Sequence, residues 1–299
     1  MRLTLLTLAG LLFTGCCYGQ APAANLEGTI LDQATGRPIP YAWVRLKNQQ
    51  SEYFADELGH FVIDATGQLQ PDTLIANGVG YLPAKQVFAP NASAKKADIS
   101  LQRVVIPTAE MPLLISKVKF ITLGSRRKVP GEGMIQAMPG AQFACLLKNE
   151  TGRTLEKIRA ASFFIAENGQ PQTKFRVRVY AVDKASGGPG KDLLVDNVIV
   201  SAPQGGAWFT IDLTLYNIPA PQEGFFVAME WLRPSNFSAS TFVDGNSGSY
   251  GQIMRPTFEF KESRTWNYTM GKGWSLITAA NAQGLRYNAM IKAEVDMIK

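Results

Sequence analysis

Residues 289–297 read Ala-Met-Ile-Lys-Ala-Glu-Val-Asp-Met, and this stretch decides the fold class. Apolar residues occupy the odd-numbered positions, and the charged residues Lys292, Glu294 and Asp296 alternate with them. Neighbouring side chains of a β-strand point to opposite faces of the sheet. An alternation with a period of two therefore predicts a strand with one buried and one solvent-facing side.

Further runs with strand character precede this stretch. They are rich in apolar residues and comprise residues 117–123, 143–147, 158–165, 175–182, 193–200, 208–215 and 225–231. The composition agrees, because the 299 residues include 27 Gly and 17 Pro, and only 18% are charged. Such a balance favours short strands joined by turns. We therefore predict an all-β fold in which residues 117–299 form a larger, jelly-roll-like β-sandwich.

A second, smaller group of strands is predicted nearer the N-terminus. Turn residues separate its runs, which are 26–32, 41–46, 61–63, 73–76 and 98–101. Short strands at this spacing predict a small β-sandwich. The apolar residues that follow, 104–116, are interrupted by Pro107 and Pro112, and we interpret them as a linker between two domains.

Three ordered motifs in this first region are similar to a known family. They read Gly28-x-Ile30-x-Asp32-x-x-Thr35-Gly36-x-Pro38-Ile39-Pro40-Tyr41-Ala42-x-Val44, then Asp56-Glu57-x-Gly59-x-Phe61, then Gly78-x-Gly80-Tyr81. Residues 26–103 thereby resemble the carboxypeptidase-like regulatory domain. The resemblance implies a transthyretin-like sandwich of seven strands, common in Gram-negative envelope proteins. It also implies an accessory domain without catalytic residues.

The first 19 residues have the composition of a signal peptide, with Arg2, an apolar run over 3–13 and then small residues. Two kinds of processing remain open. Phe13-Thr14-Gly15-Cys16 resembles a lipobox, in which Cys16 would carry a lipid anchor, whereas cleavage after Gly19 would release a protein without lipid. Either way, we expect an exported protein in the periplasm or outer membrane, or on the cell surface, of a Gram-negative bacterium.

The charge and hydropathy of the chain argue against two classes of partner. The formal net charge is +6, but the basic residues are scattered and no nucleic-acid-binding motif accompanies them. We therefore expect no nucleic-acid partner. After the leader, no apolar run approaches the ~18 residues of a membrane-spanning helix, so we expect no transmembrane helix.

Few residues suit catalysis or metal binding. The single histidine, His60, lies in the first region, and the chain has no Gly-x-Ser-x-Gly motif, so neither a zinc peptidase nor a serine hydrolase is expected. Asp and Glu residues for a glycan hydrolase are present, but their spacing identifies no catalytic pair. We expect no cofactor. Residues 244–249, Asp-Gly-Asn-Ser-Gly-Ser, are consistent with a plain loop or with a structural calcium site.

Aromatic residues near the C-terminus provide the strongest binding signal. They form, with two polar neighbours, a candidate ligand site that consists of Trp266, Asn267, Tyr268, Lys272 and Trp274. Flat rings stack on the apolar faces of sugars, and Asn and Lys can bond their hydroxyl groups. Aromatic side chains are also ordinary core material in β-domains, so a core role remains the alternative.

These observations predict an exported, non-enzymatic cell-envelope protein whose second β-domain binds glycan or a partner protein. One alternative is a structural or assembly scaffold that recognises partners through its strand edges. A glycan hydrolase ranks third.

Overall fold

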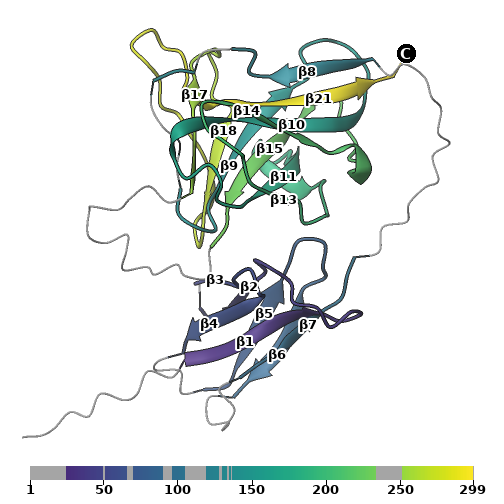
Figure 1. The fold of residues 1–299 in the computed structure, drawn as a ribbon, viewed down its shortest axis with the longest axis vertical. Coiled ribbons are helices and arrows are strands. Elements are labelled where there is room, and N and C mark those ends of the chain that lie inside the picture. The colour runs from purple at the N-terminus through teal and green to yellow at the C-terminus, as the bar shows by residue number, and fades with distance from the viewer. Residues whose placement is uncertain are drawn as a thin grey trace, which may run out of the picture.

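The computed structural model describes residues 25–49, 51–65, 70–89, 96–104, 119–127, 130–132, 135, 137–233 and 251–298. The protein is all-β, as predicted. Figure 1 shows a smaller first domain, coloured purple to blue, and a larger second domain, coloured teal to yellow. The leader with Cys16, the loop 244–249 and nearly all of the linker 104–116 lie outside the described residues. Among the described residues, no helix has the length and hydrophobicity needed to cross a bilayer.

Seven strands make up the described part of the first domain. They are β1 (Asn25–Asp32), β2 (Trp43–Leu46), β3 (Tyr53–Phe54), β4 (His60–Asp64), β5 (Asp72–Asn77), β6 (Ala84–Phe88) and β7 (Ile99–Leu101). One sheet has the order β4-β1-β7 and the other β3-β2-β5-β6. Their inward-facing residues, among them Ile30, Val44 and Phe61, are buried in one core. This domain is a small sandwich of the predicted kind.

A glycine in β1 permits an unusually close approach of two chain segments. A Cβ atom on Gly28 would lie only 1.9 Å from the carbonyl oxygen of Ala97 and 2.7 Å from the ring of Phe61. Ala97 in turn donates its backbone N–H to the carbonyl of Glu27 over 2.8 Å. Only a residue without a side chain fits here, which gives a physical reason for the first glycine of the family-like motif.

The second domain contains fourteen strands among its described residues. They are β8 (Phe120–Gly124), β9 (Gln142–Lys148), β10 (Leu155–Gly169), β11 (Phe175–Val182), β12 (Pro189–Asp192), β13 (Ile199–Val200), β14 (Ala207–Asp212), β15 (Gly224–Trp231), β16 (Gln252–Met254), β17 (Pro256–Thr257), β18 (Thr265–Thr269), β19 (Gly273–Leu276), β20 (Asn288–Ala289) and β21 (Ile291–Met297). A short 3-10 helix, η1, spans Thr214–Tyr216.

Two large sheets enclose the core of this domain. The five-stranded sheet has the order β14-β10-β21-β8, with β16 paired to β10. The seven-stranded sheet has the order β12-β11-β15-β9-β18-β19, with β13 paired to β11. Alternate residues of both sheets fill the space between them, including Phe163, Val177, Val227 and Ile291. The architecture is the jelly-roll-like sandwich predicted from the alternating pattern.

The prediction of one strand over residues 193–200 is wrong. Strand β12 ends at Asp192 and β13 begins only at Ile199, and the segment between them is irregular although Leu193 and Val198 still bond β11. Leu194 and Val198 are buried nonetheless, because the irregular segment covers the edge of the core. A buried irregular segment can contain as many apolar residues as a buried strand, so apolar content without a period of two does not identify a strand.

We expect Gly28→Ala to destabilise the first domain by about 3 kcal/mol, because the new methyl group would overlap a backbone oxygen that cannot move aside. Denaturant-induced unfolding measures this loss. Gly36→Ala is the control, since Gly36 has a φ of 65° but no atom within 4 Å of an added Cβ. It should cost only about 1 kcal/mol, from backbone strain. Equal stabilities of the two variants would contradict the proposed steric role of Gly28.

Candidate functional site

The outer face of the seven-stranded sheet carries charged and aromatic side chains, and several of them are buried. On β11, Val177 and Val179 point into the core, so Arg176, Arg178 and Tyr180 point outward. The register of β11 with β15 places Arg176 directly opposite Glu230. This sheet face therefore combines charges and rings beside one another.

A buried network of ion pairs connects these side chains. Arg176 Nη1 lies 2.6 Å from Glu230 Oε1, and each side chain is only 3% exposed. Arg178 bonds the other oxygen of Glu230 at 3.4 Å and also binds Asp192. Arg176 Nε donates to Asn197 Oδ1 over 2.7 Å. Buried charges are tolerated only when they are paired and hydrogen-bonded, a condition that Arg176 and Glu230 meet.

Arg176 also joins the two domains. Its Nη2 donates to the carbonyl oxygen of Tyr41 in the first domain over 3.0 Å. Tyr41 has a φ of 56°, in the left-handed region that non-glycine residues rarely occupy. The buried hydrogen bond gives a reason for this conformation, because it depends on where the Tyr41 carbonyl points.

Two glycines allow further close contact at the domain interface. Gly80, with a φ of 82°, approaches Val195 so closely that a Cβ atom would lie 2.5 Å from its carbonyl oxygen. At Gly140, a Cβ atom would lie 2.7 Å from the ring of Phe54. Since Gly80 and Phe54 belong to the first domain, side chains at either glycine would push the domains apart.

A cavity of about 410 Å³, here called the aromatic cavity, lies at this interface. Both domains contribute rings and polar groups to its walls, which include Tyr41, Trp43, Glu52, Phe54, Asn77, Gln142, Arg176, Arg178, Tyr180, Asp192, Glu230, Tyr268 and Trp274. Its volume falls in the range of ~300–1,000 Å³ that small-molecule sites occupy. The cavity is thus large enough for a small ligand.

The rings in this cavity are held by one another. Trp274 packs edge-on against Tyr180, with centroids 5.6 Å apart, and contacts Tyr268 at 5.3 Å. The Tyr180 hydroxyl donates to Gln142 Oε1 over 2.6 Å. Aromatic pairs in such edge-to-face arrangements are favourable and restrict ring motion. The aromatic wall is therefore largely formed before any ligand arrives.

Burial changes the acidity of groups around the aromatic cavity. Desolvation raises the pKa of the Glu52 carboxyl, opposed by Arg45 and by a hydrogen bond with Tyr268. Desolvation likewise raises the pKa of Asp192, although Arg178 opposes the effect. It also raises the pKa of the Tyr268 hydroxyl.

The structure brings together only part of the predicted ligand site. Tyr268 and Trp274 line the aromatic cavity. Trp266 shares their sheet face but packs against Gly188, where a Cβ atom would lie 2.9 Å from its ring. Asn267 points to the other face and bonds Ser275. Lys272 is exposed in the turn between β18 and β19. The last three residues do not line the cavity.

Sequence reasoning missed most of the cavity wall. Trp43 alternates with the buried residues Ala42 and Val44, which indicates that it points away from the core of its own domain. The alternation of Arg176 and Arg178 within an apolar strand was a further signal, because charges on that face need buried partners. Neither pattern identifies the domain that lies opposite.

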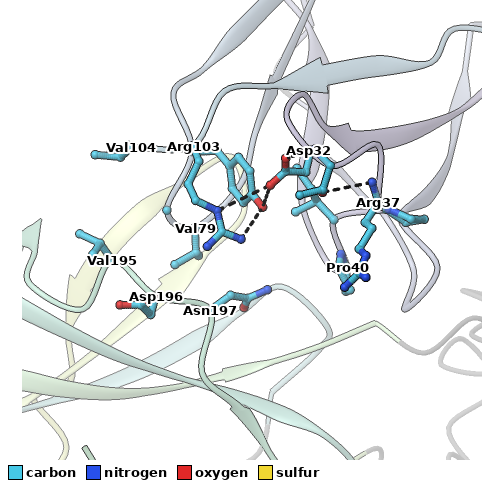
Figure 2. Close-up of a pocket in the computed structure, with 14 residues that line it drawn as sticks. Asp32, Arg37, Pro40, Val79, Arg103, Val104, Val195, Asp196 and Asn197 are labelled. Carbon is cyan, nitrogen blue, oxygen red and sulfur yellow. Dashed lines mark hydrogen bonds and ion pairs between the residues drawn. The ribbon is translucent and has the colours of Figure 1, made fainter. Parts of the chain in front are cut away.

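A second cavity of about 500 Å³, here called the polar cavity, adjoins the first. Figure 2 shows Asp32 and Arg103 of the first domain on one side, with Val195, Asp196 and Asn197 of the second domain facing them. Tyr81 donates its hydroxyl to Asp32 Oδ2 over 2.8 Å, and Arg103 donates to the same hydroxyl over 3.2 Å.

Hydrogen bonds make Asp32 unusually acidic. The Tyr81 hydroxyl is the largest cause, followed by the backbone N–H of Thr35, and together with smaller contributions they lower its pKa from 3.8 to about 2. Because the folded-state pKa lies below the ordinary value, ionised Asp32 stabilises the fold above pH 3.8, and this contribution is lost as the pH falls through about 2.

Metal-binding geometry is not found in either cavity. Among the residues that the structure describes, no three His, Cys, Asp or Glu side chains lie close enough together to hold a metal ion.

We expect Tyr81→Phe to move the pKa of Asp32 back toward 3.8, because it removes the largest stabilising hydrogen bond of the carboxylate. A carboxyl-carbon NMR titration measures the shift directly, and acid unfolding should begin at a higher pH. Tyr53→Phe is the control, because the Tyr53 hydroxyl makes no hydrogen bond within the described residues and should leave Asp32 unchanged. An unaltered Asp32 pKa in Tyr81→Phe would contradict the assignment.

We expect Arg176→Met to lower the free energy of unfolding by about 3 kcal/mol, because it leaves buried Glu230 with only its longer bond to Arg178. Arg176→Lys keeps the charge but cannot make all of the same bonds, so an intermediate loss is expected. Denaturant titration with Arg153→Met as an exposed control measures both. A stability equal to that of the unchanged protein would show that the network does not hold this face together.

Comparisons with known proteins define no family. No protein-family model and no curated protein matches the chain. The cysteine protease and lectin-like domains of Cwp84, a surface layer associated protein of Clostridium difficile, show 13% identity and a TM-score of 0.36, over 53% of this chain and 32% of that one. A variant of the same clostridial protease after propeptide cleavage gives 12% identity and a TM-score of 0.37, over 83% of this chain and 52% of that one.

A DUF3823 family protein from Bacteroides ovatus shows 9% identity and a TM-score of 0.25, over 93% of this chain and 97% of that one. This chain thus spans about a third of the first clostridial structure and about half of the second. All these similarities are too low to define a common ligand or activity.

Proposed function

We propose that this chain is an exported, non-enzymatic envelope protein that binds glycan in the aromatic cavity between its two β-domains. One observation carries the proposal: Trp43, Tyr268 and Trp274 meet there from both domains, beside hydrogen-bonding side chains. Flat rings cover the apolar faces of sugar rings, and polar side chains bond their hydroxyl groups.

The polar groups of the cavity suit a hydroxyl-rich ligand. Gln142 Oε1 accepts the Tyr180 hydroxyl and Asn77 Oδ1 accepts the N–H of Gly78, so both amides have nitrogens with no partner in the described part of the chain. Glu52 supplies a carboxyl group at the same cavity. A sugar therefore finds donors and an acceptor around the aromatic wall.

The carboxyl groups favour binding over hydrolysis. Glycoside hydrolysis needs two carboxyl groups that can exchange protons or attack the substrate. Of those that line the aromatic cavity, Glu230 is held by two arginines and Asp192 by one. Glu52 is the remaining carboxyl group among the described lining residues, and it bonds Tyr268. This arrangement supports a binding site, with hydrolysis as the third alternative.

The envelope location is inferred from the sequence. The leader 1–19 supports export, with Cys16 as a lipid anchor if the lipobox is used. We also propose that residues 26–103 are a carboxypeptidase-like regulatory domain. The seven strands of the first domain support this assignment.

A scaffold role is the second candidate, and one strand favours it. β6 forms the edge of its four-stranded sheet, and its Val87 side chain is 74% exposed. An exposed edge offers unpaired backbone groups to an extended segment of a partner protein.

We expect Trp43→Ala and Trp274→Ala each to weaken glycan binding by at least tenfold, because both remove stacking area from the cavity. The measurement is a glycan array and a cell-wall pull-down with the mature chain, read beside thermal unfolding. Trp208→Ala is the matched control, since Trp208 lies on the five-stranded sheet, outside the residues that line either cavity.

Trp43→Ala keeps the test decisive if Trp274→Ala unfolds, because Trp43 points away from the core of its own domain. Unchanged glycan binding by folded Trp43→Ala would contradict the proposed site. If the folded parent protein binds no glycan, the scaffold role remains as the candidate function and is tested with protein partners.

A further inference from the structure

The aromatic cavity and the polar cavity share one wall. Val79, Gly80, Tyr81, Val104 and Val195 line both of them. Within this strip the two domains contact each other closely, at Gly80 and Val195. The cavities therefore adjoin along the same domain boundary, and each is partly open to solvent.

From this placement we infer that the two cavities are neighbouring subsites for one extended, neutral glycan chain. The inference rests on the proposed glycan binding and adds the length and charge class of the ligand. Each cavity alone, at about 410 and 500 Å³, is of the size of a small-molecule site. A ligand of several linked sugars is needed to fill both.

The polar cavity has hydrogen-bonding groups to offer such a chain. The Arg37 guanidinium, the Asp196 carboxylate and the Asn197 amide nitrogen line it, and none has a side-chain partner within the described residues. Asp32 and Arg103, in contrast, are engaged with Tyr81 and with each other. The unengaged groups include both donors and an acceptor, as a sugar hydroxyl requires.

The charges that line the two cavities do not favour acidic glycans. The polar cavity pairs two arginines with two aspartates, and the aromatic cavity sets Arg176 and Arg178 against three carboxyl groups, those of Glu52, Asp192 and Glu230. The chain as a whole has a formal net charge of +6, yet the residues that line the two cavities carry no excess of positive charge. An acidic polysaccharide would gain no net attraction there, so the lining suits a neutral chain.

Calorimetric titration of the mature protein tests this inference. The probes are gluco-, xylo- and N-acetylchito-oligosaccharides of one to six sugars, with oligogalacturonides of matching length as acidic ligands. We expect the affinity for one neutral series to rise at least tenfold with length and then level off. Arg37→Ala/Asp196→Ala should remove this gain and leave the affinity for the shortest ligand that binds unchanged.

Arg153→Ala/Glu223→Ala is the matched control, because it also removes one exposed charge of each sign and lies outside both cavities. If one or two sugars already bind with the highest affinity, and Arg37→Ala/Asp196→Ala leaves that affinity unchanged, the two-subsite inference is overturned but glycan binding is not. Tighter binding of the acidic series would overturn the neutral class. Absence of binding to every probe by the folded protein would overturn both the inference and the proposed function.

Discussion

The buried Arg176–Glu230 pair is the interaction on which the arrangement of the domain interface and its cavities depends. Glu230 accepts from Nη1 of the guanidinium, Asn197 accepts from its Nε, and the carbonyls of Tyr41 and Pro40 accept from its Nη2. A charge buried at 3% exposure is costly unless its donors are satisfied. Here the first domain supplies two acceptors, the carbonyl oxygens of Pro40 and Tyr41, so the hydrogen bonds of this arginine are complete only when the first domain is docked against the second.

Arg176 therefore contributes orientation more than raw stability. A pair of apolar side chains could fill the same volume at similar or lower cost, but it would not select a single angle between the domains. The left-handed φ of Tyr41 and the contact of Gly80 with Val195 impose further geometric conditions on the same interface. Together these constraints bring Trp43 of one domain and Trp274 of the other to the wall of the same cavity.

The sequence was sufficient to predict the all-β class and most strands, because a period of two appears directly in the order of residues. It was insufficient where structure depends on distant partners. The pairing of β11 with β15, which brings Arg176 to Glu230, leaves no local pattern. Tyr268 and Trp274 were identified because a hairpin joins them, whereas Trp43 reaches the same cavity only through domain docking. The misassigned residues 193–200 show the converse, since burial alone resembled strand periodicity.

The walls of the aromatic cavity come from two domains that each have their own hydrophobic core, and this has a thermodynamic consequence. A ligand that contacts both walls binds the docked arrangement of the domains more tightly than the undocked one. Linkage then requires the reciprocal effect: the bound ligand raises the equilibrium constant for docking by the same factor by which docking raises the affinity for the ligand. Such a ligand acts as a reversible crosslink between the modules. Mechanical tension that separated the two domains would lower the affinity of such a ligand, so under the proposed function the strength of attachment would depend on the load that the chain carries.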